Sequence, residues 1–229
     1  MFKKYLPATL CLLALCCGLF YYQYCLAEEA PETTSATNAE TPFFRDGVPL
    51  RQIVNQWKLA LPLKDARIVI TKAERRLDLY SGQTLVKSYH VALGSNPIGA
   101  KDRRGDGRTP EGEFYICMRN GKDSAFHLFL GLSYPGLPRA TDAVNSKQIT
   151  WQQFQTIRSR LASRGTPLWN TDLGGWVGIH GGSDDSYAAK VRKKRGSPDW
   201  TAGCIALTDR EIEEIAAAAP VGTPVTILP

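Results

Sequence analysis

The sequence predicts an α+β domain, or a mainly β domain with a few helices packed on its sheet. Alternating apolar and polar residues at 67–72 and 76–80 are typical of strands, and a Ser81-Gly82 turn leads into a third such run at 85–93. A β-turn-β opening of this kind favours antiparallel pairing. Strand-like runs also outnumber helical ones along the rest of the chain, so strands are expected to form the core.

Each predicted element depends on a local pattern. The helix over 208–219 has the clearest signal, because Thr208 at its N-cap and Glu211 three residues later form a capping box. Helices over 49–61 and 150–163 are predicted from apolar residues that recur at helical spacing. The other expected elements, in chain order, are a Gly/Pro/charged loop at 94–112, strands at 113–118, 126–134 and 176–180, and a closing strand at 221–228.

The N-terminus, residues 1–27, is predicted to be a signal peptide or an N-terminal anchor. Lys3 and Lys4 precede a long apolar run, and residues 25–27 offer a cleavage site. Residues 5–24 are nearly long enough to span a bilayer without cleavage. Both alternatives predict an exported, periplasmic or cell-envelope protein, and membrane contact only through an uncleaved N-terminal segment.

Residues 28–45 are predicted to be a disordered tether, and residues 46–229 a single domain. The stretch 28–42 has no aromatic or large aliphatic side chain, so it cannot bury enough apolar surface to order itself. The chain carries a net charge of +6 and has a pI of about 9.0. Outside the cytoplasm, the anionic partners of such a chain are cell-wall polymers or lipid head groups, and this compartment excludes nucleic acid.

The positions of the six cysteines divide them into two groups. Four lie in the targeting segment: Cys11, Cys16, Cys17 and Cys25. The other two, Cys117 and Cys204, could form a disulfide in an oxidising compartment. We favour a different assignment, because Cys117 lies in the strand-like run 113–118, where a reduced cysteine behaves as a small apolar residue. Cys204 is then the free, reactive thiol.

Cys204 and an upstream histidine, His180, form the candidate catalytic pair. Cys204 follows Gly203 directly before a predicted helix, and His180 ends a predicted strand. A cysteine nucleophile, a histidine base and backbone N–H groups that bind an oxyanion are sufficient for covalent acyl transfer. A buried structural cysteine beside an unrelated histidine remains the alternative on spacing alone.

The remaining histidines and the acidic loop do not predict a metal site. His90 and His127 lie in strand-like runs and are expected to be surface or core residues. The histidines do not cluster with cysteines or acids as a zinc site requires. The loop from Asp102 carries acids at some positions of a calcium loop, but Arg104 occupies the third position, which needs an oxygen ligand. We therefore expect no metal and no cofactor.

Three segments together resemble the YkuD-type L,D-transpeptidase catalytic domain over residues 67–228. They are His180-Gly181, the Thr-Ala-Gly-Cys-Ile-Ala-Leu sequence at 201–207, and the Thr-Pro-Glu-Gly-Glu-Phe sequence at 109–114. The variant at 201–207 is similar to that of the YafK-like branch. The resemblance implies a YkuD-like antiparallel β-sandwich or sheet core with a few packed helices.

The same resemblance implies cysteine-dependent chemistry on peptidoglycan stem peptides, with no cofactor. Cys204 would form the thioester, His180 would be the base, and Gly203, Thr201 and Gly181 would supply backbone support around the oxyanion. An amine acceptor gives a cross-link. The alternatives are a hydrolase that cleaves stem-peptide bonds or the bond to a peptidoglycan-attached lipoprotein, and a non-catalytic peptidoglycan-binding module.

Two positions depart from the family pattern, and one basic segment has two interpretations. Ala202 and Ala206 replace a histidine and an arginine of the motif, which leaves His180 as the motif-matched base. The basic run at 190–195 is either a solvated surface or a guide for an anionic substrate.

Overall fold

The structure is a computed structural model that describes residues 47–124, 127–183 and 186–229. The predicted targeting segment and tether, residues 1–45, lie outside the described residues. Among the residues that are described, no helix combines the length and the apolar character needed to cross a membrane.

The described part of the chain forms a sheet of eight strands with five helices. The sheet order is β3-β2-β1-β8-β4-β5-β6-β7. The strands are β1 (Ala66–Thr71), β2 (Arg76–Ser81), β3 (Thr84–His90), β4 (Gly112–Ser124), β5 (His127–Leu132), β6 (Gly178–His180), β7 (Ile205–Ala206) and β8 (Pro224–Leu228). The helices are α2 (Leu50–Gln56), α3 (Leu137–Asn145), α4 (Trp151–Ala162), α5 (Ser186–Arg195) and α6 (Asp209–Ala218).

The α+β class predicted from the sequence is confirmed, and the sheet is mixed. The opening strands pair antiparallel as expected, β1 with β2 and β2 with β3. Two other pairs are parallel, β1 with β8 and β6 with β7. The chain runs through α5 between β6 and β7, and such a helical crossover lets a returning strand lie parallel to its neighbour.

The two edges of the sheet meet, because the chain beyond β3 bonds to β7. Ala92 donates its N–H to the carbonyl of Ala206 at 3.0 Å, and Ala206 donates back to Ala92 at 2.8 Å. One step further, Thr201 donates to Leu93 at 3.1 Å and Ser95 donates to Thr201 at 2.9 Å. The sheet is therefore curled until residues 92–95 lie beside the segment that leads into β7.

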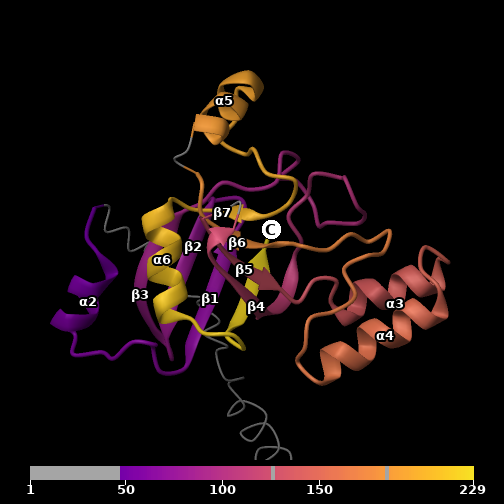
Figure 1. Ribbon diagram of the computed structural model, residues 1–229, viewed down its shortest axis with the longest axis horizontal. Helices are drawn as coiled ribbons and strands as arrows, with labels where there is room; N and C mark the ends of the chain where they lie inside the picture. The colour runs from indigo at the N-terminus through magenta and orange to yellow at the C-terminus, as the bar shows by residue number, and fades with distance from the viewer. Residues whose placement is uncertain (1–46, 125–126, 184–185) are drawn as a thin grey trace, which may run out of the picture. The chain divides into compact units, whose positions relative to one another are not determined.

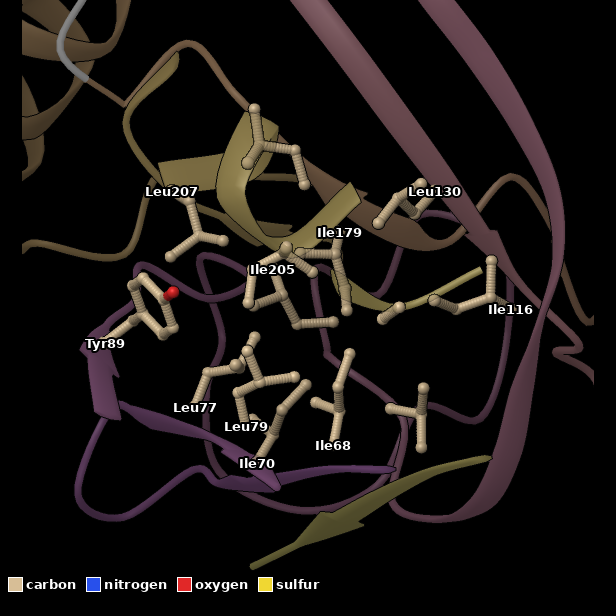
Figure 2. Packing of buried hydrophobic residues seen from close by; sticks show 14 of the residues in the cluster. Ile68, Ile70, Leu77, Leu79, Tyr89, Ile116, Leu130, Ile179, Ile205 and Leu207 are labelled. Atoms are coloured by element: carbon tan, nitrogen blue, oxygen red, sulfur yellow. The ribbon is translucent and has the colours of Figure 1, made fainter. Parts of the chain in front are cut away.

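The curled sheet encloses the main hydrophobic core. Figure 2 shows Ile68, Leu77 and Leu79 from β1 and β2 pointing toward Ile179 and Ile205 from β6 and β7. Helix α6 covers this core and α2 lies beside β3 (Figure 1). Each fully buried Leu or Ile side chain of this kind contributes about 1.5–3 kcal/mol to folding. The core thus fixes β6 and β7 rigidly against the rest of the sheet.

Several elements differ from those predicted. The expected helix 49–61 ends early, at Gln56, and Lys58 then takes a left-handed φ of 54°. β4 extends to Ser124, beyond the predicted end at residue 118. Helices α3 and α5 and the two-residue strand β7 were not predicted. The capping box of Thr208 and Glu211 at the start of α6 is confirmed, with the Glu211 N–H donated to the Thr208 hydroxyl at 3.3 Å.

Glu214 joins α6 to α2 and β3, and its removal should destabilise the fold. Its carboxylate accepts hydrogen bonds from the Leu50 N–H (2.9 Å), Lys87 (2.8 Å) and the Tyr89 hydroxyl (3.1 Å). The Lys87 side chain is only 7% exposed, so Glu214→Ala leaves a buried ammonium without its counter-ion. We expect a loss of about 3 kcal/mol in the free energy of unfolding, measured by urea denaturation.

The matched control for this variant is Glu74→Ala. Glu74 also pairs with a cation, Arg76, but its side chain is 51% exposed, so the loss should stay below about 1 kcal/mol. Equal losses for the two variants would contradict the role assigned to Glu214.

Candidate active site

His180 is the last residue of β6, Cys204 directly precedes β7, and both line one cavity. β6 and β7 are parallel neighbours, with Ile179 opposite Ile205 and His180 opposite Ala206. Ile179 and Ile205 lie in the core. The pairing of these strands therefore brings together the two side chains that the sequence predicted as a pair.

The imidazole of His180 is buried and held in one orientation. Its Nδ1 lies 2.6 Å from the carbonyl oxygen of Gly181, and a carbonyl can only accept a hydrogen bond. Nδ1 therefore carries the proton, which leaves Nε2 as the basic nitrogen. The ring stacks on Phe129, with centroids 6.5 Å apart, and meets the edge of Trp200 at 5.9 Å.

The Cys204 thiol is protonated in this environment. The residue is partly accessible, and it packs against an aromatic cluster that includes Phe129 and Trp169. Burial raises the thiol pKa to about 11, although a hydrogen bond from the Gly178 backbone and the charge of Lys101 act in the opposite direction. A proton acceptor is consequently needed before the sulfur can act as a nucleophile at neutral pH.

The turn before Cys204 is braced by Thr201. The Thr201 hydroxyl donates to the carbonyl of Cys204 at 2.8 Å and accepts the Gly203 N–H at 3.1 Å. The Gly181 N–H is donated to Leu128 and the Thr201 N–H to Leu93. The three backbone N–H groups predicted to face an oxyanion are therefore already engaged within the fold. In this arrangement they position the turn and the imidazole, and their contribution to an oxyanion site stays a prediction.

The loop 94–111 packs directly on this turn, backbone against backbone. A Cβ placed on Gly203 would lie 2.5 Å from the carbonyl oxygen of Arg108, and one on Gly94 would lie 2.2 Å from that of Gly107. Gly203 also has a φ of 136°, which side-chain-bearing residues rarely adopt. Thr109 of the 109–114 motif holds Gly94 by accepting its N–H at 2.9 Å. That part of the motif has a structural role.

An ion pair inside the loop places a positive charge beside the turn. Lys101 is 5% exposed and donates to Asp106 at 2.6 Å and to the Arg103 carbonyl at 3.1 Å. Burial tends to raise the pKa of Asp106. The Lys101 bond and the backbone N–H groups of Arg103, Arg108 and Asp102 outweigh it and lower that pKa to about 2.

A second buried carboxylate, Asp199, fixes the other side of the site. It is 1% exposed and accepts bonds from the Arg75 guanidinium, the shortest at 2.7 Å, and from the Leu93 N–H at 3.0 Å. Asp199 directly precedes Trp200 and thereby ties the segment that leads to Cys204 to the start of β2.

The candidate pair opens onto a cavity of about 810 Å³. Its lining combines His180 and Cys204 with two cations, Lys101 and Arg104, and no acidic side chain is among its lining residues in the described part of the chain. Its aromatic walls are Trp169, Trp176 and Trp200. No described residue of α5 lines the cavity, although Lys190, Lys193 and Lys194 are exposed on that helix. Such a cavity suits an elongated, anionic substrate.

The remaining predicted residues have structural positions. Cys117 is buried and both described cysteines are free, as expected. His90 is exposed at the end of β3. His127 contacts Glu213 on α6 at 2.9 Å. Ala202 is exposed at the cavity, whereas Ala206 is buried between Ala92 and His180.

Four residues of the site, Lys101, Asp106, Asp199 and Trp176, were not predicted from the sequence. The first two lie in a charged loop, where one lysine cannot be distinguished from its neighbours without the fold. Trp176 has a positive φ of 55° and is 61% exposed, and both properties are visible only in the folded structure.

The comparisons with known proteins agree with this geometry. A family model described as the L,D-transpeptidase catalytic domain, YkuD, matches residues 65–227. The chain belongs to the YkuD family of L,D-transpeptidase catalytic domains.

Individual relatives match over shorter regions or at lower identity. The protein named "Putative L,D-transpeptidase YafK" from Escherichia coli strain K12 is 34% identical over 89 residues. The match covers 36% of this chain and 36% of that protein, so the curated relative is matched over about a third of its length.

Two solved structures are also similar. Bd1075 of Bdellovibrio bacteriovorus is 18% identical with a TM-score of 0.46, over 72% of this chain and 48% of that chain. The helical cell shape determining protein Pgp2 of Campylobacter jejuni is 19% identical with a TM-score of 0.45, over 73% and 49%.

The variant Gly203→Ala tests whether stability and Cys204 reactivity depend on the close approach of the loop to the turn. In Gly203→Ala the new methyl group meets the Arg108 carbonyl, so either the loop or the turn must move. We expect a loss of roughly 1–3 kcal/mol in the free energy of unfolding and at least about 10-fold slower alkylation of Cys204 by iodoacetamide.

The control is Gly121→Ala on β4, because a Cβ there has no atom within 4 Å and the backbone φ is not positive. It should match the wild type in both measurements. A Gly203→Ala protein with unchanged stability and unchanged alkylation would show that the contact is not needed.

Proposed function

We propose that this domain carries out cysteine-dependent acyl transfer on peptidoglycan stem peptides, outside the cytoplasm. The observation that carries the proposal is that His180, at the end of β6, and Cys204, directly before β7, line one cavity. Membership of the YkuD family supports the reaction class, and the cations along the cavity favour a carboxylate-bearing peptide. The N-terminal sequence supports export.

The first half of the reaction follows from the protonation states in the site. Nε2 of His180 takes the proton from Sγ of Cys204, and the sulfur attacks the carbonyl carbon of a stem-peptide amide. The C–N bond then breaks, and the imidazolium returns the proton to the leaving amine. The acyl group remains on Cys204 as a thioester. The Cys204 N–H is the candidate backbone donor to the oxyanion, since that of Gly203 is bonded to Thr201.

The second half decides between transferase and hydrolase. An amine that attacks the thioester loses a proton to His180, restores the thiol and leaves a new amide. Water in the same place gives a carboxylic acid instead. The partly accessible sulfur and the open cavity admit either nucleophile. We propose amine transfer as the main reaction, and release of a stem residue or of an attached lipoprotein is the hydrolytic alternative.

Replacing the nucleophile should abolish activity. Cys204→Ala removes the only atom that can hold the acyl group, so we expect no detectable conversion of muropeptides by liquid chromatography and mass spectrometry. A carbapenem should add its mass to the wild-type protein and not to the variant. The control is Cys117→Ser, because Cys117 is buried and is not among the cavity-lining residues, and it should keep turnover within a few-fold. Muropeptide conversion by folded Cys204→Ala protein would exclude the thioester route.

Replacing the base should change the pH dependence as well as the rate. His180→Ala should slow acylation by a carbapenem about 100- to 10,000-fold at pH 7, the usual contribution of a positioned base. The thiol pKa is about 11, so the residual rate depends on free thiolate and should rise about tenfold per pH unit up to that value. The wild type should show a much weaker rise. Parallel pH profiles for the two proteins would mean that His180 does not take the proton.

A further inference from the structure

The strongest unexplained feature of the site is a buried ammonium group with an unused hydrogen. Lys101 Nζ has three N–H bonds. Within the described residues its acceptors are Asp106 at 2.6 Å and the carbonyl of Arg103 at 3.1 Å, which account for two of them. Its side chain is only 4% exposed, so leaving a donor unfilled is costly unless a negative group meets it. The structure thus presents one free, charged donor at the cavity.

The position of the lysine directs this donor to the nucleophile turn. The side chain passes between two glycines: Cε lies 3.4 Å from where a Cβ on Gly174 would be, and Nζ lies 3.7 Å from where a Cβ on Gly203 would be. Both glycines and Lys101 line the cavity that contains Cys204. The next residue after Gly203 is the nucleophile itself.

The counter-ion of Lys101 does not cancel its charge at the cavity. Lys101 lines the cavity, whereas Asp106 is not among the lining residues. Asp106 also accepts the backbone N–H groups of Asp102, Arg103 and Arg108, which share its negative charge. Lys101, and not Asp106, is the member of the ion pair that lines the cavity.

We propose that Lys101 is a charge-stabilising residue of the active site, whose ammonium group stabilises the Cys204 thiolate when His180 takes the thiol proton. The S–H bond breaks and an N–H bond forms at Nε2 of His180. Lys101 stays protonated throughout and transfers no proton. The positive contribution of Lys101 to the ionisation of Cys204 agrees with this direction. The inference depends on the proposed role of Cys204, but it can be tested without turnover.

The other charged groups near the sulfur do not provide the same effect. Arg104 also lines the cavity, but its side chain is exposed and its guanidinium bonds to Asn170 and to the Thr171 carbonyl. Arg108 contributes its carbonyl to the contact with Gly203. Its Nε is also buried with no partner among the described residues, but its guanidinium lies beside Gly99 and Ala100 and does not line the cavity. His180 is the base. Lys101 is therefore the cation that combines burial, a free donor and contact with the turn.

The test is the pH dependence of Cys204 alkylation, read from the Cys204 peptide by mass spectrometry. Lys101→Gln keeps a polar side chain and removes the charge. An opposite charge nearby moves a pKa by about 1–3 units, so iodoacetamide should react at least about 10-fold more slowly at pH 8. The whole profile should move to higher pH. Lys101→Arg, which keeps the charge, should restore much of the rate. Arg158→Gln, an exposed charge loss on α4, should behave as the wild type.

Two further measurements separate thiolate stabilisation by Lys101 from anion recruitment and from loss of the fold. Iodoacetate is anionic and iodoacetamide is neutral, so a lysine that only recruits anions would affect iodoacetate alone. Loss confined to iodoacetate, or an unchanged iodoacetamide profile in Lys101→Gln, would overturn the proposal. If Lys101→Gln fails to fold, Lys101→Met is the second neutral variant. Circular dichroism checks that each variant is folded.

The outcome does not depend on the proposed substrate. Slower alkylation in Lys101→Gln together with muropeptide conversion by Cys204→Ala would retain the charge effect and reject the thioester route through Cys204. Normal alkylation in Lys101→Gln together with an inactive Cys204→Ala would reject the charge effect and retain the thioester route. In a His180→Ala background, Lys101→Gln should lower the rate of Cys204 alkylation by the same factor, since the lysine is not the base.

Discussion

The closure of the curled sheet is the constraint on which the rest of the site depends. Two hydrogen bonds between Ala92 and Ala206 join the chain beyond β3 to β7, and the pairs made by Thr201 with Leu93 and Ser95 continue the contact. Without these hydrogen bonds, which form a seam between residues 92–95 and 201–206, the loop 94–111 would begin at a free sheet edge. With this seam, the loop begins beside the turn that carries Cys204 and packs over that turn. The small side chain at position 206 fits this seam, where a long polar one would have to be buried.

Each buried charge around the cavity is paired with an opposite charge or with hydrogen-bond donors. Asp199 is met by Arg75 and by the Leu93 N–H, and Asp106 by Lys101 and three backbone N–H groups. Asp199 holds the segment that leads to Cys204, and Asp106 holds the loop 94–111 that packs on the turn before it. The hydrophobic core fixes the strands, and the buried ions fix the loops between them.

Much of this architecture could be predicted from the sequence, because its signals are local. The capping box at Thr208, the alternation in the first three strands and the Gly-Cys step are all visible in short windows. Helix α3 was not predicted because Pro135 and Pro138 suggest a turn, although a proline in the first helical turn is compatible with a helix. β7 is too short to show a period. The ion pair of Lys101 and Asp106 depends on how the loop folds, and the sequence alone offered Asp106 only as part of a rejected calcium loop.

The raised pKa of Cys204 has a consequence for its redox chemistry. Peroxides and disulfides react with thiolates, and a thiol with a pKa of about 11 holds only about one thiolate in ten thousand molecules at pH 7. Burial raises the pKa of Cys117 as well, so neither sulfur readily begins an exchange with the other. The resting Cys204 is therefore mostly the thiol at neutral pH, the form that reacts slowly with peroxides and disulfides.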